Sequence, residues 1–181
     1  MATPVLAPTR ILKRPAGAAV ADSVVLAVAC LVSYWLVAHV LTHVRSVSRS
    51  DDLLGGMWAV VATVFVYRAD WRGSVAAARS RIAATTLSFA LCLIYLLVFP
   101  FHTWGLAALI GLGTLLLMLS GRSDDTVTAG ITTAVVIVVA ALSPHQAWEQ
   151  PILRLGDTLA GIAVGAGAAW VKLRVTAQRR P

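Results

Sequence analysis

Apolar residues in this chain gather into six long runs that leave only short segments between them. Hydrophobic residues make up 59% of the 181 residues, charged residues make up 13%, and the mean hydropathy is +0.82. A soluble domain of this size cannot cover so much apolar surface, whereas a helix bundle in a bilayer turns its outside toward hydrocarbon. Because each span needs about 20 apolar residues, six spans use about 120 to 130 residues. We therefore predict a single-domain, all-α membrane helix bundle of six transmembrane helices.

Short polar or proline-containing segments separate the predicted spans. The transmembrane domain covers residues 18–174, with a basic tail at 1–17 and a second one at 175–181. We expect Asp51 and Asp52 to cap the second helix, and the charged stretch 68–81 to connect the second helix to the third. The six spans are predicted at about 18–43, 53–67, 82–99, 104–120, 126–142 and 151–173.

The cationic residues lie mostly on one side of the predicted bundle. If both termini are cytoplasmic, all of the 15 Lys and Arg residues except Arg45, Arg49 and Arg154 fall in cytoplasmic segments. Cytoplasmic loops of membrane proteins carry such an excess of cations. We therefore predict a multi-pass protein of the cell (inner) membrane with cytoplasmic N- and C-termini. The net charge of +7 then has a membrane explanation, and we expect no nucleic-acid partner.

A short pattern recurs at the starts of the third and sixth predicted spans. The segments 81–88 and 154–161, offset by 73 residues, share Arg at the first place, an aliphatic residue at the second, Thr at the fifth and a small residue at the eighth. Three spans separate the two copies, so the halves would be inverted relative to each other. Inverted 3+3 repeats are common in transporters, with the substrate site between the halves. Chance similarity between two apolar helices is the alternative.

These motifs resemble those of the fusaric acid resistance (FUSC) family, which includes the aromatic acid exporters. The family pattern is a Trp in the second span, then Arg-x-x-Gly-Thr-x-x-Gly opening one helix and Arg-x-x-Asp-Thr-x-x-Gly opening the last. The resemblance covers about residues 20–174. In the first motif Ala84 and Ser88 replace the two glycines. The matching residues are Trp58, Arg81, Thr85, Arg154, Asp157, Thr158 and Gly161.

The resemblance implies a transporter that moves small aromatic or amphipathic organic anions outward, with the matching residues in its substrate or coupling site. Larger family members also carry a soluble domain or a second membrane module, and residues 1–181 hold neither. A non-transporting membrane scaffold, or a partner subunit of another envelope protein, is therefore the alternative. We expect the chain to form a homo-oligomer.

Asp157 carries the strongest functional hypothesis. Positions 154, 157 and 161 share one helix face, so Arg154 can pair with Asp157. Gly161 and Gly165 continue a stripe of small residues that lets another helix approach closely. An ionisable side chain within the bilayer is costly and often functional. Asp157 is therefore either a proton or substrate relay or, with Arg154, an anchor of the helix end within reach of water.

The other polar residues give weaker signals. Asp22 is either a second intramembrane carboxylate or an interfacial residue near Arg14. Trp58 and nearby aromatic residues are part of an aromatic substrate wall, or they simply pack in the core or face lipid. The spacing of His39 and His43 permits chelation, but nothing in the sequence brings further ligands to them, and we predict no metal and no cofactor. No catalytic motif occurs, so we expect no enzyme.

Overall fold

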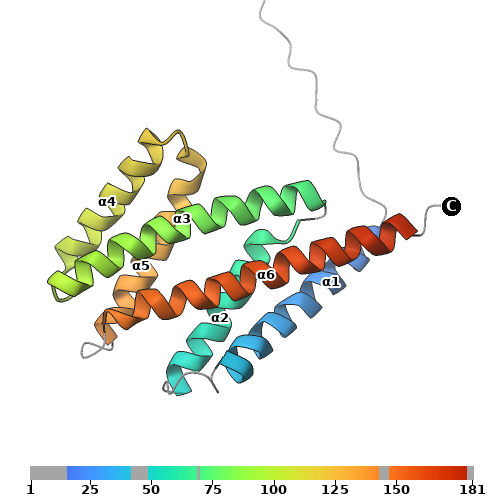
Figure 1. The fold of residues 1–181 in the computed structure, drawn as a ribbon, viewed down its shortest axis with the longest axis horizontal. Coiled ribbons are helices and arrows are strands. Elements are labelled where there is room, and N and C mark those ends of the chain that lie inside the picture. Colours follow the sequence, from blue (N-terminus) through green and yellow to red (C-terminus); the bar gives the residue numbers. More distant parts are fainter. Residues whose placement is uncertain (1–15, 42–48, 69, 143–146, 179–181) are drawn as a thin grey trace, which may run out of the picture.

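The computed structural model describes residues 16–41, 49–68, 70–142 and 147–178, and within these ranges it contains helices and no strand. The π-helical segment η1 (Leu36–Leu41) extends the first helix, and the short 3-10 helix η3 (Ser123–Asp125) precedes the fifth. The all-α prediction is thus confirmed for the described residues. The α-helices are α1 (Ala16–Trp35), α2 (Arg49–Val66), α3 (Trp71–Val98), α4 (Thr103–Leu119), α5 (Thr126–Leu142) and α6 (Glu149–Gln178) (Figure 1).

Four of the described helical segments are long and apolar enough to cross a membrane. They are Ala16–His39, Trp71–Val98, Ser123–Leu142 and Glu149–Gln178. Two further apolar helices, Leu53–Val66 and Thr103–Leu119, are shorter. The helices therefore define an integral membrane protein, and a full crossing by α2 and α4 stays a prediction.

The stretch 68–81 is not the connector that its charges suggested, because α3 begins at Trp71. The Asp70 carboxylate accepts a hydrogen bond of 2.6 Å from the backbone N–H of Gly73 and so caps the helix. The arginines of the first turns are compatible with a helix because Arg72 and Arg79 point outward, while Arg81 is buried. At the other predicted cap, α2 begins at Arg49, so Asp51 and Asp52 lie inside the helix rather than before it.

The helix ends lie alternately at two ends of the bundle. The start of α1 meets the end of α6 through an ion pair between Asp22 and Lys172. The junction of α4 and α5 lies beside the first half of α3, where Ser80 donates a hydrogen bond to Asp125. At the opposite end, Val37, Gly55 and Asp157 bring together the end of α1, the start of α2 and the start of α6. This alternation is what a chain that passes back and forth requires.

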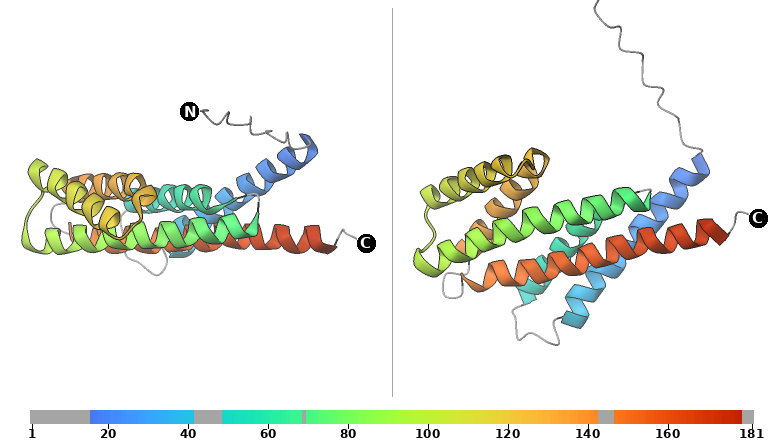
Figure 2. Two further views of the ribbon diagram at one scale, coloured as in Figure 1. Left: turned by 90° about the horizontal axis from the view of Figure 1, so that it is seen from above. Right: turned by 45° about the horizontal axis from the view of Figure 1, so that its top comes forward.

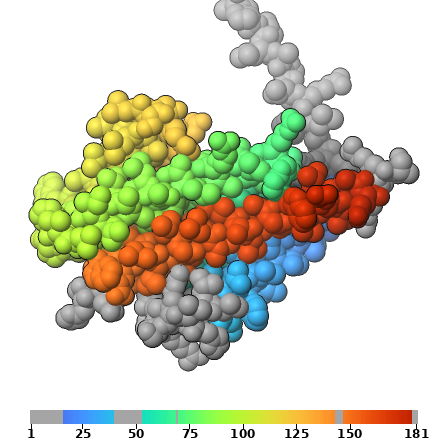
Figure 3. All heavy atoms as spheres, viewed as in Figure 1, coloured from blue at the N-terminus to red at the C-terminus, as the bar shows by residue number. Residues whose placement is uncertain are grey.

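α3 and α6 run antiparallel and side by side along one face of a flattened bundle, with α1 and α2 behind α6 and α5 behind α3 in the view of Figure 1 (Figures 1, 2 and 3). α2 packs on α6 and α5 packs on α3, while α1 packs on α2 and α4 packs on α5. One apolar cluster joins Ala78 of α3 to Ile162 of α6, and another joins Phe89 to Leu155. The segments 81–88 and 154–161 therefore lie at the same level of the bundle, on α3 and α6.

The backbones of α2 and α6 approach closely at Gly161. A methyl group added to Gly161 would lie 2.2 Å from the carbonyl oxygen of Ala59 and 2.8 Å from the Cβ of Ala62. One turn further, a methyl group on Gly165 would lie 3.0 Å from the carbonyl oxygen of Thr63. The small residues thus allow the two backbones to approach closely, which is how helices associate where lipid removes the hydrophobic driving force.

The close approach at Gly161 predicts that Gly161→Ala destabilises the bundle. The added methyl group cannot avoid the backbone of α2, so we expect the free energy of unfolding to fall by about 1–3 kcal/mol. Gly167→Ala in the same helix is the matched control, because a methyl group there meets no atom of a described residue within 4 Å. It should leave stability unchanged or raise it slightly, since Ala favours helix by about 1 kcal/mol. Equal effects in thermal unfolding of the purified variants would contradict the packing described here.

Candidate functional site

An ion pair is buried at the start of α6. Nη1 of Arg154 lies 3.0 Å from Oδ2 of Asp157, and each residue is only 2% exposed. The helix repeat places the two side chains on one face, three residues apart, as the sequence spacing predicted. The Thr158 hydroxyl donates a 2.8 Å hydrogen bond to the carbonyl oxygen of Arg154, which fixes the same turn.

α2 and the start of α6 enclose this pair. Nη2 of Arg154 lies 3.4 Å from Oε1 of Gln150, also buried. On the other side, Gly55 faces Asp157 so closely that a methyl group on it would lie 2.9 Å from Oδ2. The carboxylate therefore fits against α2 only because residue 55 has no side chain.

Both side chains of this pair are buried within the described part of the chain. Separating two charges in such surroundings costs far more than at a surface, because desolvation of each ion is then uncompensated. Such burial is compatible with a relay and with an anchor of the helix end, so both roles of Asp157 stay predictions.

Arg81, the counterpart of Arg154 in the first motif, has a different environment. It is 5% exposed, and its guanidinium carbon lies 4.6 Å from the centre of the Phe65 ring on α2. No carboxylate of a described side chain is within ion-pair distance of it, whereas Arg122, Arg154 and Lys172 each have one. The two motif arginines are therefore both buried, but among the described side chains only Arg154 has a neighbouring acid.

The other motif residues occupy the interior between the helices. Thr85, one turn after Arg81, is 1% exposed, and its hydroxyl has no hydrogen-bond partner among the described residues. Ser88, which replaces a family glycine, donates to the carbonyl oxygens of Ala84 and Ala129 at 2.9 and 3.1 Å and so joins α3 to α5. Trp58 is 5% exposed and packs in the apolar cluster with Phe89 and Val136, so it is a core residue of this chain.

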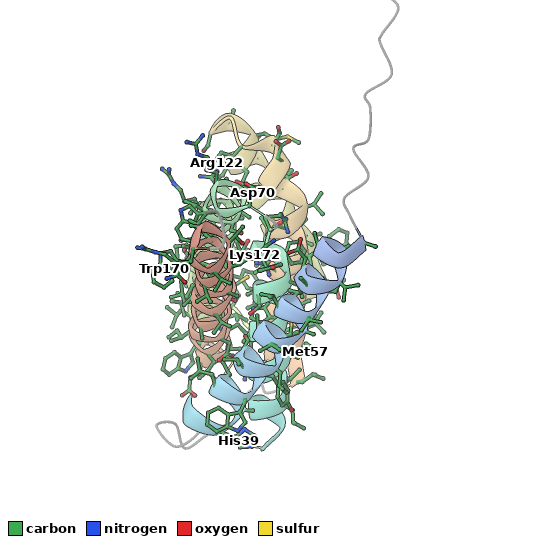
Figure 4. The ribbon with its side chains drawn as sticks, turned by 90° about the vertical axis from the view of Figure 1, so that its right-hand side faces the viewer. His39, Met57, Asp70, Arg122, Trp170 and Lys172 are labelled. Atoms are coloured by element: carbon green, nitrogen blue, oxygen red, sulfur yellow. The ribbon has the colours of Figure 1, made fainter. Side chains whose placement is uncertain are left out.

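Asp22 lies away from these residues, at the end of the bundle where α1 meets α6. It pairs with Lys172, whose position on α6 is labelled in Figure 4. The pair lies at one end of an apolar groove of about 850 Å³ between α1 and α6, with Val28, Val32 and Val164 further along it. Asp22 is thus a partly buried member of an interhelical ion pair and is not brought to the Arg154–Asp157 pair.

A second Arg–Asp pair was missed by the sequence reasoning. Arg122 contacts Oδ2 of Asp125 through Nε and Nη2, both at 2.7 Å, and the same carboxylate accepts a hydrogen bond from Ser80. Asp125 is buried, and Arg122, labelled in Figure 4, is partly exposed at the bundle end. The signal was the Arg-x-x-Asp spacing, identical to that of Arg154 and Asp157, in the segment between the fourth and fifth predicted spans.

The described side chains contain no group of three or more His, Cys, Asp or Glu residues arranged to hold a metal ion. The ring of His39 stacks on Trp35 with centroids 5.8 Å apart. His43 and His145 lie outside the described residues, so the His39–His43 spacing receives no structural account.

Long apolar helices around an interior that contains charged and hydroxyl side chains define a polytopic membrane protein. The family model described as "Fusaric acid resistance protein-like" matches residues 32–168. The chain therefore belongs to this family, as the motifs around Arg81 and Arg154 indicated. No curated protein and no solved structure matches the chain.

The buried pair predicts that Asp157→Asn lowers stability. The variant leaves the Arg154 guanidinium facing a neutral group in the interior, so the free energy of unfolding should fall by about 2–3 kcal/mol. Asp124→Asn is the matched control, because Asp124 is exposed and the same change at a surface site has an effect within about 0.5 kcal/mol. Chemical or thermal unfolding of both proteins in detergent measures the difference. Indistinguishable stabilities would mean that the ion pair contributes nothing to folding.

Proposed function

We propose that this protein is an inner-membrane transporter that moves small aromatic or amphipathic organic anions outward. Membership of the fusaric acid resistance-like family supports a transport role in general. The observation that carries the proposal is the position of the two motif segments, 81–88 and 154–161, on α3 and α6 at one level of the bundle. A site between two halves of a transporter has this arrangement.

The pattern of burial supports an inverted 3+3 repeat. At the same offset of 73 residues that aligns the two motifs, buried positions of α3 coincide with buried positions of α6. Positions 78, 81, 84, 85, 88, 89, 92 and 96 correspond to 151, 154, 157, 158, 161, 162, 165 and 169. Chance similarity of two apolar sequences does not require the buried faces to agree at this offset.

The helix packing supports the same repeat. In an inverted repeat α1 would correspond to α4, α2 to α5 and α3 to α6. The contact of α1 with α2 then corresponds to that of α4 with α5, and the contact of α2 with α6 to that of α5 with α3. The contact of α1 with α6 corresponds to that of α4 with α3, and all six contacts occur. The close contact of Gly161 with Ala59 has its counterpart in the hydrogen bond from Ser88 to Ala129. We infer that residues 18–99 and 104–173 are the two halves, related by an axis in the membrane plane.

The second candidate function is a non-transporting membrane scaffold or partner subunit. The observation in its favour is the tight backbone contact between α2 and α6 at Gly161, which a rigid module would also need. In either role we propose that the chain works in the lipid bilayer, forms a homo-oligomer and acts neither as an enzyme nor on nucleic acid.

The proposed topology, six spans with cytoplasmic termini, predicts sided labelling by a membrane-impermeant thiol reagent. After Cys30 and Cys92 are replaced by Ser, single cysteines at the exposed positions Asp124 and Ala177 should react only from the cytoplasmic side. A cysteine at the exposed His102 should react only from outside. Labelling of His102→Cys and Asp124→Cys from the same side would overturn the six-span arrangement.

The transport proposal predicts efflux of an aromatic carboxylate from liposomes that contain the purified protein. The probe is a fluorescent aromatic acid that does not cross protein-free vesicles. If Asp157 relays protons, Asp157→Asn should lose efflux driven by a pH gradient but keep exchange of labelled for unlabelled anion, because exchange needs no net proton movement. Asp124→Asn is the control and should keep both activities.

Retained exchange is the readout that separates a relay role from a folding defect, since a misfolded variant loses both activities. Gradient-driven efflux by Asp157→Asn at the wild-type rate would remove Asp157 from the mechanism. Absence of both activities in the wild-type protein, across a panel of organic anions, would favour the scaffold.

A further inference from the structure

We propose that Arg81 is the anion-binding residue of this protein and that its ligand is the carboxylate of a small organic anion. The inference rests on the proposed function only in its choice of ligand class. The binding site itself follows from the surroundings of Arg81 and from the contrast with Arg154.

Arg81 is a buried cation without a protein counter-ion among the described residues. The described carboxylates that are wholly or partly buried and form ion pairs are engaged elsewhere: Asp22 with Lys172, Asp125 with Arg122 and Asp157 with Arg154. Asp70, nearer the start of α3, is exposed and caps that helix. The guanidinium of Arg81 makes a cation–π contact with the ring of Phe65 in the described structure.

The face of an aromatic ring offsets only part of the desolvation of a guanidinium. A buried charge that lacks an opposite charge is strongly unfavourable, and an Arg cannot relieve the cost by releasing its proton. In the second motif, Asp157 offsets the desolvation cost of Arg154 by pairing with it. The corresponding residue of the first motif, residue 84, is an alanine. The missing carboxylate at Arg81 is therefore the group that a ligand would supply.

Donor groups beside this charge are unpartnered among the described residues. The Nε–H of Arg81 is buried and has no hydrogen-bond partner in the described structure, and the Thr85 hydroxyl one turn further along α3 is in the same condition. Phe65 lies against one face of the guanidinium and so does not occupy its in-plane N–H edge. That planar edge matches the two oxygens of a carboxylate better than it matches a spherical anion. An organic carboxylate is accordingly favoured over chloride.

For Arg81→Gln we expect a gain in stability instead of the usual loss. A structural arginine would lower stability when lost, but an uncompensated one should raise it, because Gln removes a buried charge that the folded protein does not neutralise. We expect the unliganded variant to melt about 2–6 °C above the wild type. Arg79→Gln, an exposed arginine in the same helix, is the matched control and should melt like the wild type.

Ligand binding is measured by thermal shift with sodium benzoate against sodium chloride of equal ionic strength. The Tm of the wild type and of Arg79→Gln should rise with the logarithm of the benzoate concentration, as for any ligand that binds only the folded state. Arg81→Gln should show no rise. Benzamide, which has the same ring without the charge, should shift none of the three proteins.

Three results of the thermal measurements would overturn the proposal: an undiminished benzoate response in Arg81→Gln, no benzoate response in the wild type, or failure of Arg81→Gln to fold. Arg81→Lys adds a graded test, because it keeps the charge but loses the planar edge, and it should weaken benzoate binding about tenfold. The assay needs no transport. Benzoate binding at Arg81 without efflux would overturn the proposed function and leave the site, whereas efflux unchanged in Arg81→Gln would overturn the site and leave the function.

Discussion

The close approach of α2 and α6 at Gly161 is the constraint on which the interior of this protein depends. In a bilayer, apolar side chains gain little from leaving lipid for protein, so helices are held by tight packing and by polar contacts. The Thr63 hydroxyl lies 3.0 Å from the carbonyl oxygen of Gly161 and 2.9 Å from Ser33 Oγ, which ties α1 and α2 to α6 at this point. One turn earlier on α6, the same approach brings α2 over the carboxylate of Asp157.

This packing explains why charged side chains can reside in the centre of a strongly apolar chain. α2 and α6 exclude solvent from Arg154 and Asp157, and exclusion of solvent makes their mutual attraction strong and their separation costly. On α3 the same kind of burial surrounds Arg81, but the described side chains supply no acid there. The two halves of the chain thus share a framework but differ in charge. Arg154 is paired with an acid, whereas we propose that Arg81 binds an anionic ligand.

Much of this arrangement was predictable from the sequence. The lengths of the apolar runs gave the helices, with α5 placed at residues 126–142 as found, and the spacing of Arg154 and Asp157 gave their contact. Local signals failed where a charged segment was helical. The arginines before Ile82 looked like a connector because a sequence does not reveal that Arg72 and Arg79 point outward from a continuous α3.

Contacts between distant helices could not be predicted. The hydrogen bond from Ser80 to Asp125, the ring of Phe65 against Arg81 and the absence of a described acid beside Arg81 all depend on which helix faces meet.

The most direct test of the account is a solid-state NMR measurement of dipolar coupling between carboxyl-¹³C benzoate and ¹⁵N-labelled arginine side chains in bilayers. The account predicts a coupling in the wild-type protein that disappears in Arg81→Gln. A coupling that persists in that variant, or none in the wild type, would contradict it.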